Sequence, residues 1–180
     1  MIKDVIYLTK KLSTKNMVIT ALLIAFGIII PTAFGFLRVV LPPAFTATIT
    51  AHVPIFVAMF ISPASAIFTA IGTAIGFLIS GLDMVVTARA ASHIVFAVVG
   101  AYMIKKKVNI AAVGAITAVV HAICEAIVVY VFLSLGWTTS NDSFVKIAFY
   151  TTGIGTLIHH TIDYIIAIIL VKALAKTKAI

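Results

Sequence analysis

Three apolar stretches of this 180-residue chain each carry two ionisable residues spaced four positions apart. The pairs are Arg89 with His93, His121 with Glu125, and His159 with Asp163. On a helix, residues four apart project from the same face, so each pair can act at one site. An ionisable group inside a long apolar segment costs about 2.5–3.5 kcal/mol on membrane-insertion scales, which makes these residues candidates for function.

Arg89, His93 and Glu125 lie at similar depth, roughly 8 to 15 Å from the outer ends of their segments at a rise of 1.5 Å per residue. This match predicts a shared interior cavity. Because a guanidinium can hold a carboxylate through two parallel hydrogen bonds, we expect Arg89 to anchor a carboxylated ligand. The other candidate ligand-binding residues are His93, His121, Glu125, His159 and His52, with Tyr130 and Trp137 as aromatic or hydrogen-bonding groups near the outer end.

The same residues leave other interpretations open. In a purely structural network, Arg89 would pair with Glu125 and the histidines would satisfy their neighbours, without any ligand. His160 and Asp163 could equally face a partner helix or a structural neighbour. Histidines on different segments could ligate a haem, and a mixed histidine–carboxylate metal site is chemically possible. The haem candidates are His52, His93, His121 and His159, and the metal candidates are His121, Glu125, His159 and Asp163.

Sequence motifs for catalysis are absent from the chain. It has no His-Glu-x-x-His, no Gly-x-Ser-x-Gly and no Walker A sequence. We therefore predict no enzymatic activity and no resident metal or cofactor. If ATP powers the protein, the ATPase must be another chain.

Composition places these residues in a membrane protein. Hydrophobic residues make up 63% of the chain and charged residues 10%, whereas a soluble domain has about 45–50% and 25%. A helix needs roughly 20 apolar residues to cross a bilayer, so six crossings would use about 120 residues. We predict a single all-α membrane domain over residues 1–180, a bundle of six transmembrane helices. The expected spans are 16–31, 45–61, 64–80, 84–104, 110–135 and 144–174.

The basic residues indicate an orientation for this bundle. Ten of the 13 lysines and arginines flank apolar segments on what would be one side, namely Lys3, Lys10, Lys11, Lys15, Lys105, Lys106, Lys107, Lys172, Lys176 and Lys178. Cytoplasmic loops are enriched in such residues, so both termini are predicted to face the cytoplasm. The net charge of +8 is then explained by anchoring beside anionic lipid, and we predict no nucleic acid partner.

Two further patterns concern helix contacts and connections. Residues 32–43 form a mostly apolar segment bracketed by prolines. It is too short to span, so it is either an interfacial connector or a lid over the cavity. Gly72, Gly76 and Ser80 share one face of the third segment, which predicts that another helix packs closely there.

Nearly the whole chain resembles the S component, the substrate-binding membrane subunit of an energy-coupling factor (ECF) vitamin transporter. The resemblance lies in the length, the six predicted spans, the orientation, the basic ends, and Ala21 and Ala25 in the first span. These alanines match the Ala-x-x-x-Ala pair with which S components dock on the transmembrane coupling subunit. The stretches 50–56 and 88–93 look most like those of niacin-type S components.

The resemblance implies a function and a set of partners. An S component binds its vitamin near the outer face, under the loop between the first two helices, which here is the 32–43 segment. It implies a small vitamin as ligand, with niacin first and pantothenate, riboflavin or thiamine as alternatives. The expected partners are a coupling subunit and two ATPase subunits, and the expected location is the cell membrane.

Overall fold

The computed structural model describes residues 13–177 as a bundle of helices with one small β-hairpin. Lys3, Lys10, Lys11 and Lys178, which carry part of the predicted orientation, lie outside the described residues. The elements are α1 (Thr14–Ala33), the 3-10 turn η1 (Gly35–Leu37), β1 (Arg38–Leu41), β2 (Phe45–Thr48), α2 (Val53–Ile61), α3 (Pro63–Ile79), α4 (Met84–Lys105), α5 (Ile110–Ser134), the π-helical η2 (Lys146–Ile154) and α6 (Gly155–Lys176).

Short polar residues set the beginnings of several helices. The Ser13 hydroxyl accepts the backbone N–H of Asn16 at the start of α1, and the Asn109 side chain accepts that of Ala111 at the start of α5. Ser62 caps α3 and is followed by Pro63 at the first helical position. The first N–H groups of a helix have no partner within the helix, so a side chain that accepts one of them favours a helix start. Proline favours the first helical position because it has no N–H to satisfy. The break between α2 and α3 therefore falls where the sequence places a turn.

The segment expected as one span over 45–61 is not a single helix, and this corrects the expectation. Residues 45–48 form β2, which pairs antiparallel with β1 in the register Arg38 to Thr48 and Leu41 to Phe45. Only Val53–Ile61 is helical, and its nine residues rise about 14 Å, too little to cross a bilayer alone. The threonines at 46, 48 and 50 are β-branched, which favours extended over helical backbone. The fold is thus an all-α membrane domain with an inserted hairpin.

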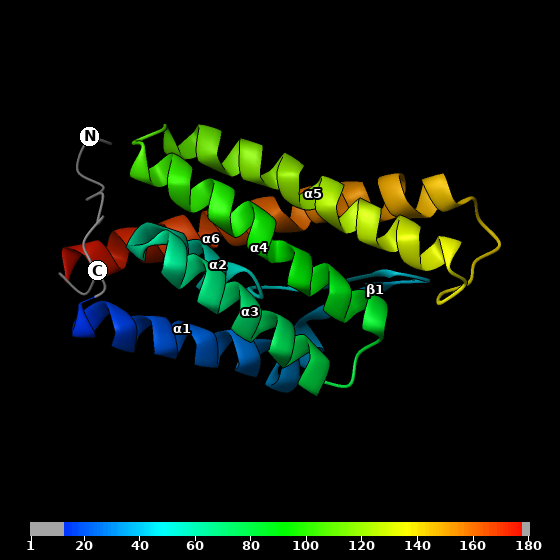
Figure 1. Ribbon diagram of the computed structural model, residues 1–180, viewed down its shortest axis with the longest axis horizontal. Helices are drawn as coiled ribbons and strands as arrows, with labels where there is room; N and C mark the ends of the chain where they lie inside the picture. The colour runs from blue at the N-terminus through cyan, green and yellow to red at the C-terminus, as the bar shows by residue number, and fades with distance from the viewer. Residues whose placement is uncertain (1–12, 178–180) are drawn as a thin grey trace.

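The long helices run side by side along the longest axis of the molecule (Figure 1). The start of α1, the α4–α5 turn and the end of α6 lie at one end. The hairpin and the α3–α4 and α5–η2 connections lie toward the other. The short α2 is enclosed by α1, α3, α4 and α6, and all nine of its residues are buried. It forms the centre of the core with Phe96 of α4 and Val113 of α5.

Four helical stretches are long and apolar enough to cross a membrane. They are Thr14–Ala33, Met84–Lys105, Ile110–Ser134 and the continuous η2–α6 helix Lys146–Lys176. The apolar α3 is shorter, with 17 residues. Many large apolar side chains of these helices point outward, among them Phe26, Ile123 and Ile169. An outer surface of this kind suits contact with lipid rather than water.

The glycine face of α3 packs against α1, which confirms the close helix contact predicted there. A Cβ on Gly76 would lie 2.6 Å from the Cα of Ile28 and 2.8 Å from the carbonyl oxygen of Gly27. Gly72 faces the side chain of Ile24 in the same way. Only a residue without a side chain lets the two backbones approach so closely.

We expect Gly76→Ala to destabilise the protein by about 1–3 kcal/mol, because the added methyl meets backbone atoms that cannot rotate away. The matched control is Gly153→Ala, where the nearest atom would be 3.7 Å from the new Cβ, an ordinary contact. Thermal unfolding in detergent should show a lower Tm for Gly76→Ala only. Equal Tm values for the two variants would contradict the close α1–α3 contact.

Candidate functional site

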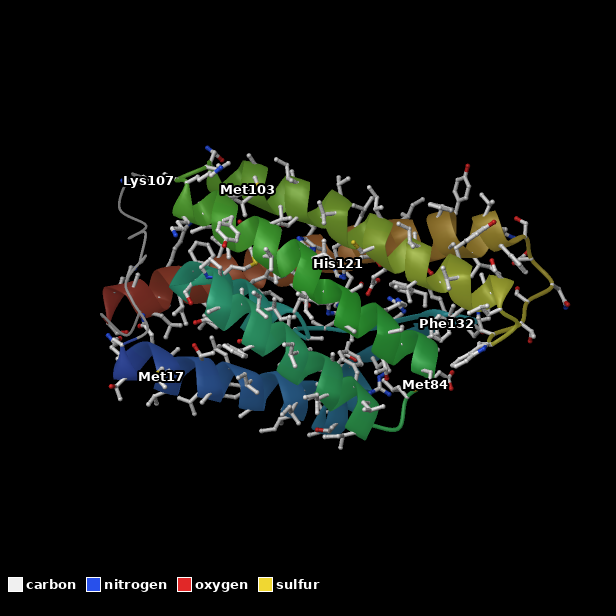
Figure 2. The ribbon with its side chains drawn as sticks, in the orientation of Figure 1. Met17, Met84, Met103, Lys107, His121 and Phe132 are labelled. Atoms are coloured by element: carbon white, nitrogen blue, oxygen red, sulfur yellow. The ribbon has the colours of Figure 1, made fainter. Side chains whose placement is uncertain are left out.

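A buried ion pair joins α4 to α5 near the middle of the bundle. Arg89 Nη2 donates to Glu125 Oε2 over 2.8 Å, and both residues are 3% exposed. His121, one helical turn before Glu125, lies between the end that carries Lys107 and the end that carries Met84 and Phe132 (Figure 2). Two opposite charges buried together avoid most of the cost of burying either alone. The pair therefore places a fixed charge centre inside the membrane domain.

Arg89 also holds the hairpin onto the bundle. Its Nη1 donates to the carbonyl oxygen of Ala44 over 2.9 Å, and its Nη2 donates to that of Thr46 over 3.2 Å. The guanidinium lies 5.1 Å from the ring centre of Phe45, a cation–π contact. One side chain of α4 thus binds three successive residues at the start of β2.

Three side chains besides Arg89 lie against the Glu125 carboxylate. His93 Nε2 lies 3.1 Å and His121 Nε2 3.3 Å from Oε1. Thr156, at the start of α6, donates its hydroxyl to Oε2. The Glu125 carboxylate therefore connects α4, α5 and α6 at one point.

Asp163 of α6 organises the turn between β2 and α2. Its Oδ1 accepts the backbone N–H of Thr50 over 2.8 Å, and its Oδ2 accepts the backbone N–H and ring Nδ1 of His52 over 3.0 and 3.1 Å. Thr50 has a φ of 73°, a conformation that is unfavourable for a β-branched residue. Such strain persists only where surrounding contacts impose it, and here the Asp163 carboxylate supplies them.

All five histidines of the chain belong to one cluster. The ring centre of His52 lies 4.5 Å from that of His93, 4.7 Å from that of His121 and 4.6 Å from that of His159. His121 and His160 face each other through their Nδ1 atoms at 3.0 Å. Four of the five are at most 3% exposed, and they come from the β2–α2 turn, α4, α5 and α6.

A small cavity lies between the hairpin and these residues, with a volume of about 10 Å³, room for about one water molecule. Thr46, Arg89, His93, Glu125 and His159 contribute to its lining. Among the described residues, Thr46 Oγ1, Arg89 Nε and His93 Nδ1 are buried there without a hydrogen-bond partner. A buried polar atom without a partner costs about 1–3 kcal/mol, so a polar occupant of this cavity, such as a water molecule, would satisfy these atoms.

The structure brings together six of the eight predicted ligand-binding residues: Arg89, His93, His121, Glu125, His159 and His52. Tyr130 and Trp137 lie elsewhere. Tyr130 is 43% exposed and packs on Phe144 and Phe149, and Trp137 is 66% exposed and packs on Phe132. The Arg89–Glu125 pair also fits the alternative interpretation, in which these residues form a structural network without any ligand.

Sequence reasoning left two contributors to the site undecided and missed two others. His160 and Asp163 face the cluster, although their sequence positions left that undecided. The hydroxyl of Thr156 binds Glu125, and Phe45 packs on Arg89 from the hairpin. Thr156 precedes His160 by four positions and Asp163 by seven, the spacing of one helix face, so that face could have been found. Phe45 carried no signal, because a helix was expected there.

Comparison with known proteins identifies one relative. The chain is 37% identical over 175 residues to the niacin transporter NiaX of Lactococcus lactis subsp. cremoris (strain MG1363), and the match covers 93% of this chain and 78% of the relative. No family model and no solved structure matches.

We expect Asp163→Asn to lower the free energy of unfolding by about 3–5 kcal/mol, because an amide offers one acceptor where the carboxylate serves three N–H groups. The matched control is Asp142→Asn. Asp142 forms an exposed ion pair with Lys146, and its loss should cost at most about 1 kcal/mol. Thermal unfolding of the two variants in the same detergent measures both. Similar losses would show that Asp163 does not hold the turn.

Proposed function

This chain belongs to the niacin-transporter family of ECF S components, and from that premise we propose that it is the niacin-binding membrane subunit of an ECF importer. Nicotinate, the anionic form of niacin, is a flat pyridine ring with one carboxylate. In the proposed site, Arg89 binds the carboxylate and the buried histidines surround the ring. The subunit performs no chemistry on its ligand. It is a multi-pass protein of the cell membrane, and its relative is a transporter.

The observation that carries this proposal is the pair of unsatisfied donors at the cavity. Arg89 Nε and Thr46 Oγ1 are both buried and have no partner among residues 13–177, and both residues line the same cavity. A carboxylate accepts such hydrogen bonds strongly, because its charge assists them. His93 Nε2 is already committed to Glu125. The anion is thus expected on the hairpin side of the Arg89–Glu125 pair, away from the Glu125 carboxylate.

Binding requires the hairpin to move, since a cavity of about 10 Å³ cannot hold a pyridine ring. We assign the lid to the whole hairpin, residues 38–48, and not only to the 32–43 segment. The outer strand β1 exposes Val39, Val40 and Leu41, whereas Phe45, Ala47 and Thr48 of β2 are buried against the site. The movable element thus includes both the cover and part of the cavity wall.

We place both termini in the cytoplasm and count six crossings of the membrane, the second of them made by β2 and the short α2 together. The described lysines support this orientation. Lys105, Lys106 and Lys107 lie at the α4–α5 turn and Lys172 and Lys176 near the end of α6, at the same end as the start of α1 (Figure 1). Clustered lysines favour the cytoplasmic side. The hairpin and the ligand cavity then open toward the exterior.

The proposed partners are a transmembrane coupling subunit and two ATPase subunits. Ala21 and Ala25 are exposed on α1, which packs on α3 through Gly27. Two small exposed residues one helical turn apart allow a helix of another subunit to approach closely. This face is the proposed docking surface for the coupling subunit. Since the chain has no Walker A sequence, ATP hydrolysis belongs to its partners.

We expect Arg89→Ala to weaken nicotinate binding by about 30-fold or more, because a buried charged hydrogen bond is worth at least about 2 kcal/mol. Wild type should prefer nicotinate over neutral nicotinamide, and the variant should lose this preference. Lys146→Ala removes an exposed cation outside the cavity and serves as the control. Isothermal titration of the three purified proteins in nanodiscs, each with nicotinate and with nicotinamide, measures these affinities.

Two outcomes of this titration would overturn the proposal. Unchanged nicotinate affinity in a folded Arg89→Ala variant would remove Arg89 from the site. Tighter binding of pantothenate, riboflavin or thiamine to wild type would replace niacin as the ligand. A binding panel with all four vitamins therefore accompanies the variants.

We expect the double substitution Ala21→Trp with Ala25→Trp to block assembly with the coupling subunit while nicotinate binding to the solitary chain persists. Two indole rings would hold the partner helix away from α1. Ala91→Trp places the same ring at an exposed alanine of α4 and should leave assembly intact. Co-purification of the coupling subunit with each tagged chain is the measurement. Normal co-purification of the double variant would exclude this surface.

A further inference from the structure

We propose that His52, His93 and His121 bind one divalent transition-metal ion of the zinc type beneath the hairpin. The inference goes beyond the proposed function, since a niacin transporter needs no metal for the binding described above. One ring nitrogen from each of these histidines lies within 4.8 Å of the other two. All three residues are at most 3% exposed. The proton positions on the three rings decide which nitrogens can bind the ion.

Hydrogen bonds to the two carboxylates determine the proton positions in His52 and His93. A carboxylate accepts, so His52 donates to Asp163 through Nδ1 and keeps a lone pair on Nε2. By the same reasoning, His93 donates to Glu125 through Nε2 and keeps a lone pair on Nδ1. His93 Nδ1 is buried and has no partner among the described residues. Metal-bound histidines show this pattern, in which one nitrogen donates to a carboxylate and the other binds the ion.

The metal-bound arrangement places the proton of His121 on Nδ1. In it, the hydroxyl of Thr117 donates to the carbonyl oxygen of Val113 over 2.7 Å and accepts from His160 Nε2 at 3.1 Å. His160 Nδ1 then carries the lone pair of that ring and accepts from His121 Nδ1. The lone pair of His121 lies on Nε2, 3.3 Å from Glu125 Oε1, and this atom has no hydrogen-bond partner within residues 13–177.

In this arrangement of protons, the lone pair on His121 Nε2 faces the Glu125 carboxylate, and a cation bound there would resolve the contact. Zn–N bonds of about 2.0–2.1 Å place tetrahedral ligand atoms about 3.3 Å apart, so small side-chain rotations would bring the nitrogens into range. The Glu125 carboxylate, which accepts from His93 Nε2, balances part of the ion's charge.

The charges of the site also favour a cation. In the described cluster, the carboxylates of Glu125 and Asp163 outnumber the single guanidinium of Arg89, which leaves one negative charge in excess when the histidines are neutral. A divalent ion reverses the excess to one positive charge. A buried site with a net positive charge attracts a monovalent anion. His52 and His93 line the cavity, so an open coordination position of the ion would face it.

Metal titration of the chelator-treated chain, purified through a tag without histidines, tests the inference. Zn²⁺ or Co²⁺ should bind at one ion per chain, measured by elemental mass spectrometry after gel filtration, and Mg²⁺ should not bind because imidazole ligands disfavour it. His93→Ala and His121→Ala should each weaken Zn²⁺ binding by about 100-fold. Co²⁺ should give the visible absorption of a tetrahedral site.

A matched variant separates this site from a neighbouring alternative. His52, His159 and Asp163 form a second group with ligand atoms close together. His159→Ala should leave the Zn²⁺ stoichiometry unchanged if His52, His93 and His121 hold the ion. Loss of Zn²⁺ in His159→Ala alone, equal binding of Mg²⁺, or no stoichiometric binding by wild type would each overturn the proposal. Because the titration contains no nicotinate, its failure would leave the niacin proposal standing.

Discussion

The buried pair of Arg89 and Glu125 is the interaction on which the arrangement of this bundle depends. Neither charge can stay in the middle of a membrane domain without the other, because the cost of an isolated charge there exceeds that of most packing defects. The pair therefore sets the relative depth of α4 and α5. Thr156 brings the start of α6 to the same carboxylate. Arg89 fixes the hairpin through the carbonyl oxygens of Ala44 and Thr46. Four parts of the chain thus meet at one ion pair.

The same constraint explains how irregular backbone can lie among membrane helices. Peptide groups outside helices must find partners within the protein, since lipid offers none. Residues 44–52 meet this requirement from two sides. Arg89 donates to the carbonyl groups at the start of the segment, and Asp163 accepts the N–H groups of Thr50 and His52 at its end. The hydrogen bonds between β1 and β2 satisfy part of the backbone between them. Two charged side chains of helices, one of each sign, therefore hold a segment that would otherwise be unstable in a membrane.

Periodicity in the sequence predicted most of the site, and failed where backbone hydrogen bonding decides the structure. The four-residue spacing of Arg89 with His93 and of His121 with Glu125 correctly placed these side chains on facing helices. Gly72 and Gly76 correctly indicated a close helix contact. The hairpin was missed because the expected span 45–61 was drawn from hydropathy, which does not distinguish extended from helical backbone in so short a segment as 45–48. The roles of His160 and Asp163 depend on their contacts with Thr117 and with the Thr50 backbone, which are far away in sequence.

Tyr130 and Trp137 are aromatic residues near the outer end, and no spacing rule indicates whether such residues face a cavity or lipid.

Arg89, the proposed ligand anchor, also holds the hairpin. In the closed arrangement, both terminal nitrogens of its guanidinium bond to Ala44, Thr46 and Glu125, and Nε is without a partner in the described part of the chain. In the proposed site, a ligand carboxylate that binds Nε and Nη2 together would compete for Nη2 with the carbonyl oxygen of Thr46 and with Glu125. Because a carboxylate is a stronger acceptor than a peptide carbonyl, this exchange would replace the Thr46 contact and release the hairpin at that point. Glu125 stays bound to the other face of the cluster through Thr156 and His93. In the proposed function, opening of the cavity and capture of the anion would thus be a single exchange of hydrogen bonds at one guanidinium.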